Sequence, residues 1–417
     1  MRPLLEASFR AAIAAADPLQ IVAPHLPPGP KGRTYVAAAG KAAASMAAAA
    51  EAHWRGELSG VAITRYGHGV PTKRIRVVEA GHPVPDEAGE AAAREILGEV
   101  RKLGPDDLLL ALLSGGGSSL LSLPAADVPI ADLKKVTSQL LKSGAAIQEM
   151  NTVRKHLSAI HGGRLAAASR APVVALIISD VTGDDPTHIA SGPCAPDPTT
   201  YAAAREILAR YRIDPPASIK ARLQKAADET PKPGDSMFAK VQNKVIATAH
   251  GSLEAAAQVF AKKGITPVIL GDAVTGEAAE VAKVMAALVY EIRHHQKPWK
   301  PPVALISGGE CTVTITGLKE NEAARGGRCA EFLLSLGVET GGIWAIACDT
   351  DGIDGTEDNA GAVLTPDSLA RAQTKKVNAK ELLARHDSYG FFSALGDLVV
   401  TGPTRTNVND YRAIVIA

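Results

Sequence analysis

The segment Leu108–Leu113 restricts the fold more than any other part of the sequence. It is a run of six apolar residues between Pro105-Asp106-Asp107 and a glycine-rich loop. A run this short is typical of a strand that is buried on both faces, as in a parallel sheet covered by helices. The loop that follows the run consists of Ser114, Gly115, Gly116, Gly117, Ser118 and Ser119.

This loop is the first candidate binding site. Glycines leave backbone N–H groups uncovered, and the serine hydroxyls beside them add further donors. In an open α/β sheet, ligands bind beyond the carboxyl ends of the strands, where the loop is expected to lie. The sequence therefore predicts a phosphate- or carboxylate-binding loop, with a flexible surface turn as the alternative.

The same pattern recurs along the chain. Thr34–Ala39 is followed at once by Gly40-Lys41 and by an alanine-rich segment, typical of a helix, to about His53. Val173–Ser179 is a further apolar run, and Asp180 follows it. Strands that alternate with helices at this spacing indicate βαβ units. The N-terminal part is therefore predicted to be a Rossmann-like, three-layer α/β/α domain with a parallel sheet.

The length of 417 residues favours two domains or more. The proline- and glycine-rich stretch 229–236 is the expected linker. It separates a predicted N-terminal domain, residues 1–232, from a C-terminal domain, residues 237–417. Thr312–Thr316 alternates polar and apolar residues close behind another apolar run. This succession indicates antiparallel pairing, so the C-terminal α/β domain is expected to contain a mixed sheet.

Charge and composition exclude several classes of protein. The chain has 45 Lys and Arg against 44 Asp and Glu, and an aromatic content of 4%. It therefore offers neither a basic field nor base-stacking rings to a nucleic acid. No apolar run approaches the ~18 residues that span a bilayer, and no signal peptide is evident. The four cysteines form no CxxC pair. We expect a cytoplasmic enzyme without membrane or nucleic-acid partners.

Two groups of basic residues are candidates for binding an anion. Lys41 stands where a helix is expected to begin, and the helix dipole disfavours a cation there unless an anion is bound nearby. Asn151, Arg154 and Lys155 have the i, i+3, i+4 spacing of one helix face. Phosphate or carboxylate binding is the sharper interpretation. A surface lysine and a solvated basic face are the alternatives.

Asp180 and Asp184 are candidates for metal binding and for catalysis, because they come directly after an apolar run. Carboxylates at the end of a parallel strand suit a Mg²⁺ ion that carries nucleotide phosphates. They could equally accept the proton of a substrate hydroxyl. Ordinary turn chemistry is the alternative.

The second half of the sequence repeats the succession of apolar runs and polar loops. Its candidate residues are Gly309, Glu310, Arg328, Asp351, Asp354, Thr404 and Asn407. The acidic loop among them lacks the glycine spacing of an EF-hand. Loops that supply lysine, arginine and carboxylates, without a thiol nucleophile, suit phosphoryl transfer, because that reaction depends on positioning and charge neutralisation.

Together the motifs resemble those of the type II glycerate 2-kinases, whose C-terminal part is the MOFRL domain, here about residues 300–412. The matching segments stand in the order of the family over nearly the whole chain. They are AGKAA at 39–43, AGHPVPD at 80–86, LSGGGSSLL at 113–121, NTVRKHL at 151–157, SDVTGD at 179–184, SGP at 191–193, SGGE at 307–310, GGR at 326–328, DGIDG at 351–355 and residues 401–410.

The resemblance implies a reaction and a location for it. The reaction is the ATP-dependent phosphorylation of D-glycerate to 2-phospho-D-glycerate with Mg²⁺, in a cleft between two α/β domains. It also implies that Lys41 and Arg328 are catalytic. The choice of the C2 over the C3 hydroxyl rests on the resemblance alone.

Two other functions stay open at this point. A hydroxypyruvate reductase, a name that the family has carried, would use NAD(P)H, yet no GxGxxG motif follows an early strand. A non-catalytic phosphosugar-binding protein would leave the acidic loops without a task. The sequence also leaves the oligomeric state open, a homodimer included.

Overall fold

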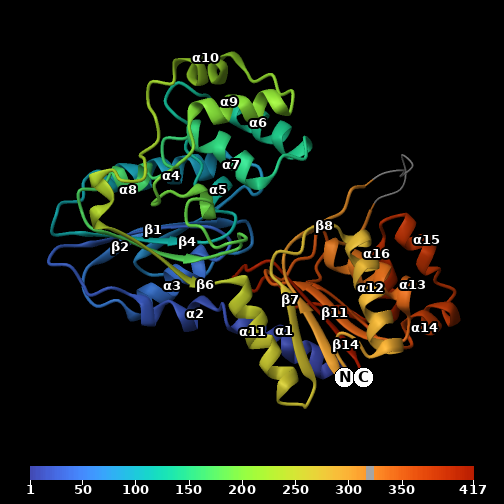
Figure 1. Ribbon diagram of the computed structural model, residues 1–417. Helices are drawn as coiled ribbons and strands as arrows, with labels where there is room; N and C mark the ends of the chain where they lie inside the picture. Colours follow the sequence, from blue (N-terminus) through green and yellow to red (C-terminus); the bar gives the residue numbers. More distant parts are fainter. Residues whose placement is uncertain (316–323) are drawn as a thin grey trace. The chain divides into compact units, whose positions relative to one another are not determined.

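Two compact units make up the protein in the computed structural model, which describes residues 1–315 and 324–417 (Figure 1). The N-terminal unit is residues 18–246, and the C-terminal unit combines residues 1–17 with residues 247–417. The units therefore divide the chain at other positions than the sequence-predicted domains, 1–232 and 237–417.

The segment 229–236, which we expected to be a linker, is anchored within the N-terminal unit. The carboxylate of Glu229 lies 2.9 Å from Nε2 of His156 and accepts a hydrogen bond from the backbone N–H of Tyr201 at 3.2 Å. The ammonium of Lys232 donates to the hydroxyl of Thr230 at 2.8 Å. The prolines and glycine of this segment therefore mark an irregular but fixed path.

The N-terminal sheet has six strands in the order β3-β2-β1-β4-β5-β6. They are β1 (Thr34–Ala39), β2 (Leu58–Arg65), β3 (Ile75–Ala80), β4 (Leu108–Leu113), β5 (Val173–Ile178) and β6 (Val241–Ala247). The neighbouring pairs from β3 to β5 are parallel, and every residue of β1, β4 and β5 is buried. The apolar runs that predicted β1 and β4 match these strands because both strand faces are covered.

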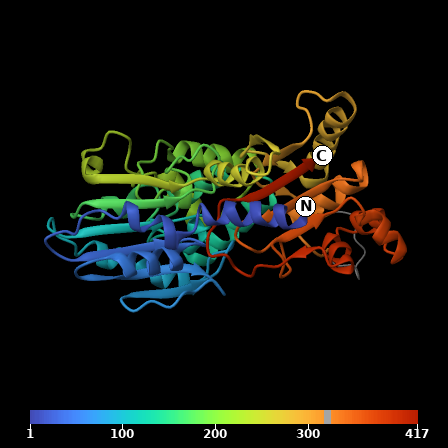
Figure 2. The ribbon, with the colours of Figure 1, turned by 90° about the horizontal axis from the view of Figure 1, so that it is seen from below.

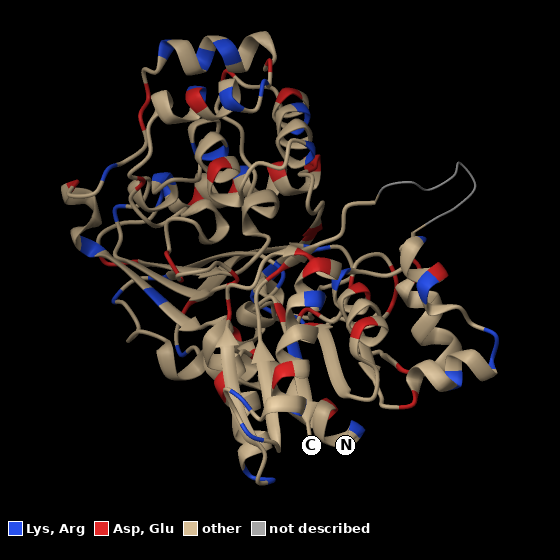
Figure 3. Cartoon of the chain, turned by 45° about the vertical axis from the view of Figure 1, so that its right-hand side comes forward, with Lys and Arg blue, Asp and Glu red and all other residues tan. Residues whose placement is uncertain are grey.

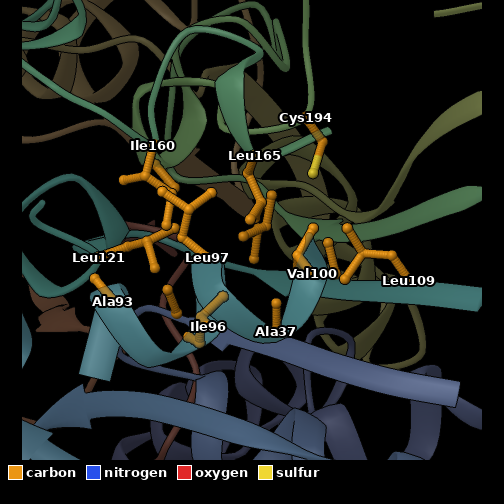
Figure 4. Close-up of a cluster of buried hydrophobic side chains, with 14 of the residues drawn as sticks. Ala37, Ala93, Ile96, Leu97, Val100, Leu109, Leu121, Ile160, Leu165 and Cys194 are labelled. Carbon is orange, nitrogen blue, oxygen red and sulfur yellow. The ribbon is translucent and has the colours of Figure 1, made fainter. Parts of the chain in front are cut away.

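Helices cover both faces of this sheet (Figure 1). One face carries α2 (Pro18–Ile21), η1 (Ala23–His25) and α3 (Ala43–His53), and the other carries α4 (Glu87–Val100), α5 (Gly117–Leu120) and α8 (Arg164–Ala167). Figure 4 shows the core on the α4 face, with the labelled side chains Ala37, Ala93, Ile96, Leu97, Val100, Leu109, Leu121, Ile160, Leu165 and Cys194. The predicted three-layer α/β/α arrangement is confirmed.

Four more helices of this unit share a separate apolar core. They are α6 (Ile130–Lys142), α7 (Ile147–His156), α9 (Tyr201–Arg210) and α10 (Ala217–Lys225), and the short turns η2 (Ile189–Ser191) and η3 (Ser236–Lys240) complete the unit. Helix α7 packs against α9 and η2, and seven of its ten residues are buried. The polar side chains of α7 are therefore held inside the unit.

The C-terminal sheet also has six strands, in the order β13-β12-β11-β14-β9-β7. They are β7 (Thr266–Gly271), β9 (Val303–Ser307), β11 (Trp344–Asp349), β12 (Gly361–Leu364), β13 (Leu398–Val399) and β14 (Asp410–Ile416). Strands β7 and β9 are parallel, whereas β14 is antiparallel to both β9 and β11. The predicted mixed sheet is confirmed.

The segment that we expected to make this sheet mixed lies outside it. Only Cys311–Thr312 is a strand, β10, and it pairs in parallel with β8 (Gly276–Glu277) in a separate small sheet. Residues 313–315 form no strand, and Thr316 is outside the described residues. The antiparallel pairing comes from the terminal strand β14, which lies between β9 and β11 and runs opposite to both, and from the pairs β11–β12 and β12–β13.

Helices lie on both faces of the C-terminal sheet (Figure 1). One core contains residues of α12 (Ala278–His295) and α13 (Arg328–Thr340), and the other contains residues of α1 (Arg2–Ala14) and α11 (Ala249–Ala261). The smaller helices are α14 (Ser368–Thr374), α15 (Ala379–Ala384) and α16 (Ser388–Leu395).

The first helix of the chain belongs to the C-terminal unit. Figure 2 shows α1, in blue, beside β14, in red. The rings of Phe9 and Tyr411 stack with their centroids 6.0 Å apart, and the Tyr411 hydroxyl donates to Ser8 at 2.7 Å. These buried contacts explain why residues 1–17 group with the end of the chain.

Charged side chains of both signs are interspersed over both units (Figure 3), in agreement with the net charge of +1. This distribution differs from the one-sign stripe of many nucleic-acid-binding proteins. Within residues 1–315 and 324–417, no helix combines the length and the hydropathy of a membrane span.

Candidate active site

The loops after β1 and β4 meet at the carboxyl edge of the N-terminal sheet, where these strands are parallel neighbours. Gly40 has a φ of +130°, and a Cβ atom at this position would lie 2.1 Å from the Ser114 hydroxyl. Only glycine fits such an approach. The backbone N–H of Lys41 donates to the carbonyl of Gly115 at 2.8 Å. The loop of Lys41 and the glycine-rich loop therefore form one structural element.

The side chain of Lys41 runs beside the glycine-rich loop. A Cβ atom on Gly116, whose φ is +82°, would lie 3.3 Å from Cγ of Lys41 and 3.0 Å from the ring of His82. The hydroxyl of Ser114 accepts a hydrogen bond from the backbone N–H of Ala42 at 3.0 Å, which ties the loop to the start of α3. An anion on the loop would therefore lie next to a cation.

Arg154 is a buried cation on α7. Its side chain donates to Oδ1 of Asn151 at 3.3 Å, and the residue is only 8% exposed. Burial lowers the pKa of Arg154 to about 10, and no carboxylate among the described residues offsets this effect. A buried charge without a counter-charge is costly. The surroundings of Arg154 therefore favour an anion from outside the protein.

Lys155, the next residue of the helix, is in the opposite situation. Its ammonium is fully buried and lies 3.2 Å from Oδ1 of Asp197, which also accepts from the hydroxyl of Thr199 at 2.7 Å. Burial lowers the pKa of Lys155, and the Asp197 carboxylate opposes that shift. The burial of Asn151, Arg154 and Lys155 excludes a solvated basic face, and Arg154 is the stronger candidate for a ligand.

Hydrogen bonds connect α7 with the glycine-rich loop. The hydroxyl of Ser191 lies 2.8 Å from the hydroxyl of Ser118 and 3.1 Å from Oδ1 of Asn151. The amide of Asn151 donates to the carbonyl of His188 at 3.2 Å. Since Arg154 donates to the same oxygen of Asn151, Ser118 and Arg154 are positioned through shared partners.

Asp180 and Asp184 follow β5, the parallel neighbour of β4, so they belong to the same edge of the sheet. Both residues are half-buried. The backbone N–H of Asp184 donates to the carbonyl of Val181 at 3.0 Å. Within the part of the chain that the structure describes, no group of three or more His, Cys, Asp or Glu could hold a metal by itself. The metal role of the two acids stays a prediction.

A second cluster belongs to the C-terminal unit and centres on Arg328, the first residue of α13. Its Nε lies 2.9 Å from Asp410, its Nη2 lies 2.7 Å from Asp349, and its Nη1 lies 3.2 Å from Glu310. Burial alone would lower the pKa of Arg328, but these carboxylates raise it well above its usual value. Two of the acids are buried and Glu310 is exposed. A ligand would therefore replace Glu310 most easily.

Strand register explains why two buried acids meet at one arginine. Asp349 ends β11 and Asp410 begins β14, and the two residues are opposite each other in the antiparallel pair. Like charges in this position repel, and the guanidinium of Arg328 removes the repulsion. Arg412 binds the other oxygen of Asp410 at 2.7 Å and the carbonyl of Gly308 at 2.8 Å.

Other predicted residues surround this cluster. The two carboxylate oxygens of Asp354 accept the backbone N–H groups of Cys329 at 3.0 Å and Ala330 at 2.8 Å, so Asp354 caps α13. Burial raises the pKa of Asp354 to about 6. The carbonyl of Asp351 accepts from the backbone N–H of Thr404 at 3.0 Å. Asp354 therefore acts on the helix that presents Arg328.

Gly309 and Asn407 stand closer to the sheet. The carbonyl of Gly309 accepts from the backbone N–H of Asp410 at 3.1 Å. Asn407 is buried, and its side-chain oxygen accepts from the backbone N–H of Asn409 at 3.4 Å. The structure thus groups several predicted residues around Arg328 in the C-terminal unit, and it connects the glycine-rich loop with Lys41, Asn151 and Arg154 in the N-terminal unit.

Comparisons with known proteins identify the family to which the chain belongs. Residues 4–224 match a family model described as a domain of unknown function (DUF4147), and residues 303–410 match the MOFRL family. A protein of Agrobacterium vitis, provisionally named hydroxypyruvate reductase, is 53% identical over 100% of this chain and 94% of its own. A glycerate 2-kinase of Pyrococcus horikoshii is 40% identical over 93% of this chain and 87% of its own. The chain belongs to the type II glycerate 2-kinase family.

A solved structure supports the same assignment. The crystal structure of glycerate kinase from Thermotoga maritima is similar, with a TM-score of 0.87 and 36% identity, and the match covers 100% of this chain and 99% of that one. The fold described above is therefore that of the glycerate 2-kinase family, in which the sequence motifs had placed the chain.

Sequence reasoning missed Arg412 of this glycerate 2-kinase family member, and it placed Asp349 and Asp410 in polar loops without assigning them to Arg328. Asp349 lies at the carboxyl end of an apolar strand, which is the signal that identified Asp180, whereas Asp410 and Arg412 lie at the beginning of β14. Their meeting depends on the antiparallel register of β11 and β14, and the sequence pattern does not reveal this register.

Proposed function

We propose that this protein transfers the γ-phosphoryl group of ATP to the C2 hydroxyl of D-glycerate, with ADP and 2-phospho-D-glycerate as products. Family membership supports this reaction. The observation within the molecule that carries the proposal is the buried guanidinium of Arg154, which has no carboxylate partner among the described residues. It is linked through Asn151 and Ser191 to Ser118 of the glycine-rich loop. Such a site selects a small anion.

The chemical step assigns a task to each predicted group. The C2 oxygen forms a bond to the γ-phosphorus while the bond from that phosphorus to the β–γ bridging oxygen breaks. The hydroxyl proton passes to a carboxylate, Asp180 or Asp184. Lys41 neutralises charge on the transferred group. Phosphate oxygens are held by backbone N–H groups of the glycine-rich loop other than those of Ser114, Gly117 and Ser119, which donate to backbone carbonyls. Arg328 supports the same charge once its Glu310 contact gives way.

ATP is the co-substrate in this proposal, and Mg²⁺ would accompany it. Mg²⁺ in phosphoryl-transfer sites keeps several waters and binds one or two carboxylates together with the phosphates. The half-buried Asp180 and Asp184 fit this mode. Bound there, Mg²⁺ would neutralise phosphate charge. A cytoplasmic location belongs to the same proposal, and the four free cysteines agree with it.

The metal assignment has a direct test. Asp180→Asn or Asp184→Asn should raise the Mg²⁺ concentration that gives the half-maximal rate. Unchanged Mg²⁺ titrations in both variants would move the metal to the acidic loop of residues 349–354.

The reaction itself is tested by ADP release with D-glycerate, followed by NMR identification of the phosphorylated carbon. Lys41→Ala should lower kcat about 100-fold, as loss of one preorganised charge contact does. Its melting temperature should stay close to that of the wild type. Wild-type turnover in Lys41→Ala would remove Lys41 from the mechanism.

Hydroxypyruvate reduction is the second candidate, and the name of the Agrobacterium vitis relative favours it. The loop after β1 has no GxGxxG motif, which a dinucleotide-binding reductase would place there. NADH absorbance in the presence of hydroxypyruvate separates the two functions. NADH consumption without ADP release from D-glycerate would overturn the kinase proposal.

A further inference from the structure

A small cavity in the N-terminal unit lies between the glycine-rich loop and helices α6 and α7. Its polar lining residues are Ser118, Ser119, Ser122, Thr137, Arg154, Ser158 and His161. Five of the seven carry hydroxyls that can donate or accept. One is the cation described above, and the last is a histidine that sequence reasoning did not single out.

His161 is buried, with 2% of its surface exposed, and its Nε2 has no hydrogen-bond partner among the described residues. The ring also interacts with the backbone of Leu121, in a contact that on its own would raise the pKa of His161. A contact of that sign is an N–H donating to a carbonyl. Because Nε2 has no partner, the donor is Nδ1, and Nε2 keeps its lone pair.

The ring is also held neutral. Burial lowers the pKa of His161 to about 3, and the nearby charges of Arg154 and Lys155 lower it further. A neutral ring with a protonated Nδ1 can only accept a hydrogen bond at Nε2. The residues that line the cavity thus include a cation and a neutral ring whose buried Nε2 can accept a hydrogen bond from a donor such as a hydroxyl.

We propose that this cavity is the hydroxy-acid subsite, in which Arg154 binds the carboxylate and Nε2 of His161 accepts a hydrogen bond from a hydroxyl. This inference rests on the proposed function. Because the C2 hydroxyl of D-glycerate takes the phosphoryl group, the hydroxyl on His161 is that of C3. His161 is a positioning residue that distinguishes D-glycerate from 2-hydroxy acids without a C3 hydroxyl.

D-lactate is the matching probe, because it is D-glycerate without the C3 hydroxyl. The wild-type protein should be inhibited by D-lactate with an inhibition constant at least about tenfold above the KM for D-glycerate. His161→Leu should lower kcat/KM for D-glycerate about tenfold, because it removes the acceptor. The inhibition constant of D-lactate should stay within about twofold, since D-lactate does not use that acceptor.

Two further variants separate recognition from structure. His161→Gln keeps an acceptor at the end of its side chain and should recover part of kcat/KM. His156→Gln is the matched control: His156 is equally buried on α7, but both its ring nitrogens have partners, the Thr152 carbonyl at 2.8 Å and Glu229 at 2.9 Å. His156→Gln should leave unchanged the ratio of the inhibition constant of D-lactate to the KM for D-glycerate.

The outcomes are distinguishable. Failure of the wild type to release ADP with D-glycerate would overturn the proposed function. Normal turnover of D-glycerate, combined with D-lactate binding as tightly as D-glycerate, would overturn only the subsite. This comparison uses the wild-type protein alone. An equal loss for both ligands in His161→Leu, or wild-type kinetics in that variant, would show that an ordered water or packing occupies the cavity instead.

Discussion

Arg154 in the N-terminal unit and Arg328 in the C-terminal unit are both largely buried, yet their electrostatic surroundings are opposite. Arg154 has a neutral amide as its hydrogen-bond partner, and burial lowers its pKa to about 10. Arg328 contacts three carboxylates, which raise its pKa well above the usual value. The first site lacks negative charge, and the second has an excess of it.

This difference separates two ways in which an arginine can serve a reaction. An arginine without a counter-charge destabilises the empty protein and is stabilised by an anionic ligand. An arginine bound by carboxylates is fixed in position, and a ligand has to share or displace one of them. We therefore assign recognition of the substrate carboxylate to Arg154 and a pre-positioned charge to Arg328.

The largest effect expected from this comparison is on stability. Arg328→Met should lower the free energy of unfolding by about 3 kcal/mol, because it leaves Asp349 and Asp410 buried and facing each other. Arg154→Met should leave that free energy unchanged or raise it, because it removes a charge without a partner. Urea denaturation of both variants at pH 7 measures the difference, and the slope m should be the same for both.

The opposite ranking would break the comparison. A larger loss of stability in Arg154→Met than in Arg328→Met would mean that Arg154 has a compensating partner. Equal losses would mean that the two sites do not differ in charge balance.

The pH dependence of stability sharpens the comparison. The pKa of His161 is about 3 in the folded protein, against an ordinary value of 6.5, so the unfolded chain binds more protons between these values. The contribution of neutral His161 is complete above pH 6.5 and is lost as the pH falls. At pH 5 the loss is about 2 kcal/mol, from 1.36 kcal/mol per pH unit. Urea denaturation at pH 7 and pH 5 should show a smaller difference in His161→Leu than in the wild type.

Asp354, in the C-terminal unit, is expected to change stability with pH in the direction opposite to His161. Burial raises its pKa from 3.8 to about 6, so the folded protein binds more protons between these values. Its contribution therefore falls as the pH rises from 4 to 6, opposite to that of His161. Asp354→Asn should remove this fall. If His161→Leu and Asp354→Asn changed the pH dependence of the free energy of unfolding in the same direction, the opposite charge effects given to His161 and Asp354 would be wrong.

The smallest effect is expected at Glu310, the exposed partner of Arg328. Glu310→Gln should change the free energy of unfolding by about 0.5 kcal/mol or less, because exposed ion pairs contribute little. Chemical denaturation with and without 0.5 M NaCl checks this. A loss comparable with that of Arg328→Met would show that Glu310 is a structural partner rather than a replaceable one.

Much of the fold could be predicted from the sequence, because buried strands need continuous apolar runs. Thr34–Ala39 and Leu108–Leu113 form strands over the predicted residues. Helices α9 and α10 were not predicted, because their apolar residues face a small helical core rather than a sheet. The pairing of strands was less predictable. Thr312–Thr316 has the polar–apolar alternation of a strand, but Thr312 belongs to a separate small sheet.

The candidate site could be predicted in part. Glycines and polar residues after strands identified the loops of Lys41 and Ser114, because strand ends gather at one edge of a sheet. Arg328 was identified from the glycine turn before it and from the family resemblance. The burial of α7 could not be read from its polar sequence, and the partner of Lys155, Asp197, comes 42 residues later. The role of His161 Nε2 as a hydrogen-bond acceptor could not be predicted either, because its burial and its lack of a partner depend on the fold around it.

The central claim is that Arg154 receives the carboxylate of the substrate, and the most direct test is kcat/KM for D-glycerate at saturating ATP in Arg154→Met. We predict a loss of about 100-fold, in keeping with a charge-assisted contact, in a protein at least as stable as the wild type. A kcat/KM within about twofold of the wild-type value, in a folded variant, would contradict the claim.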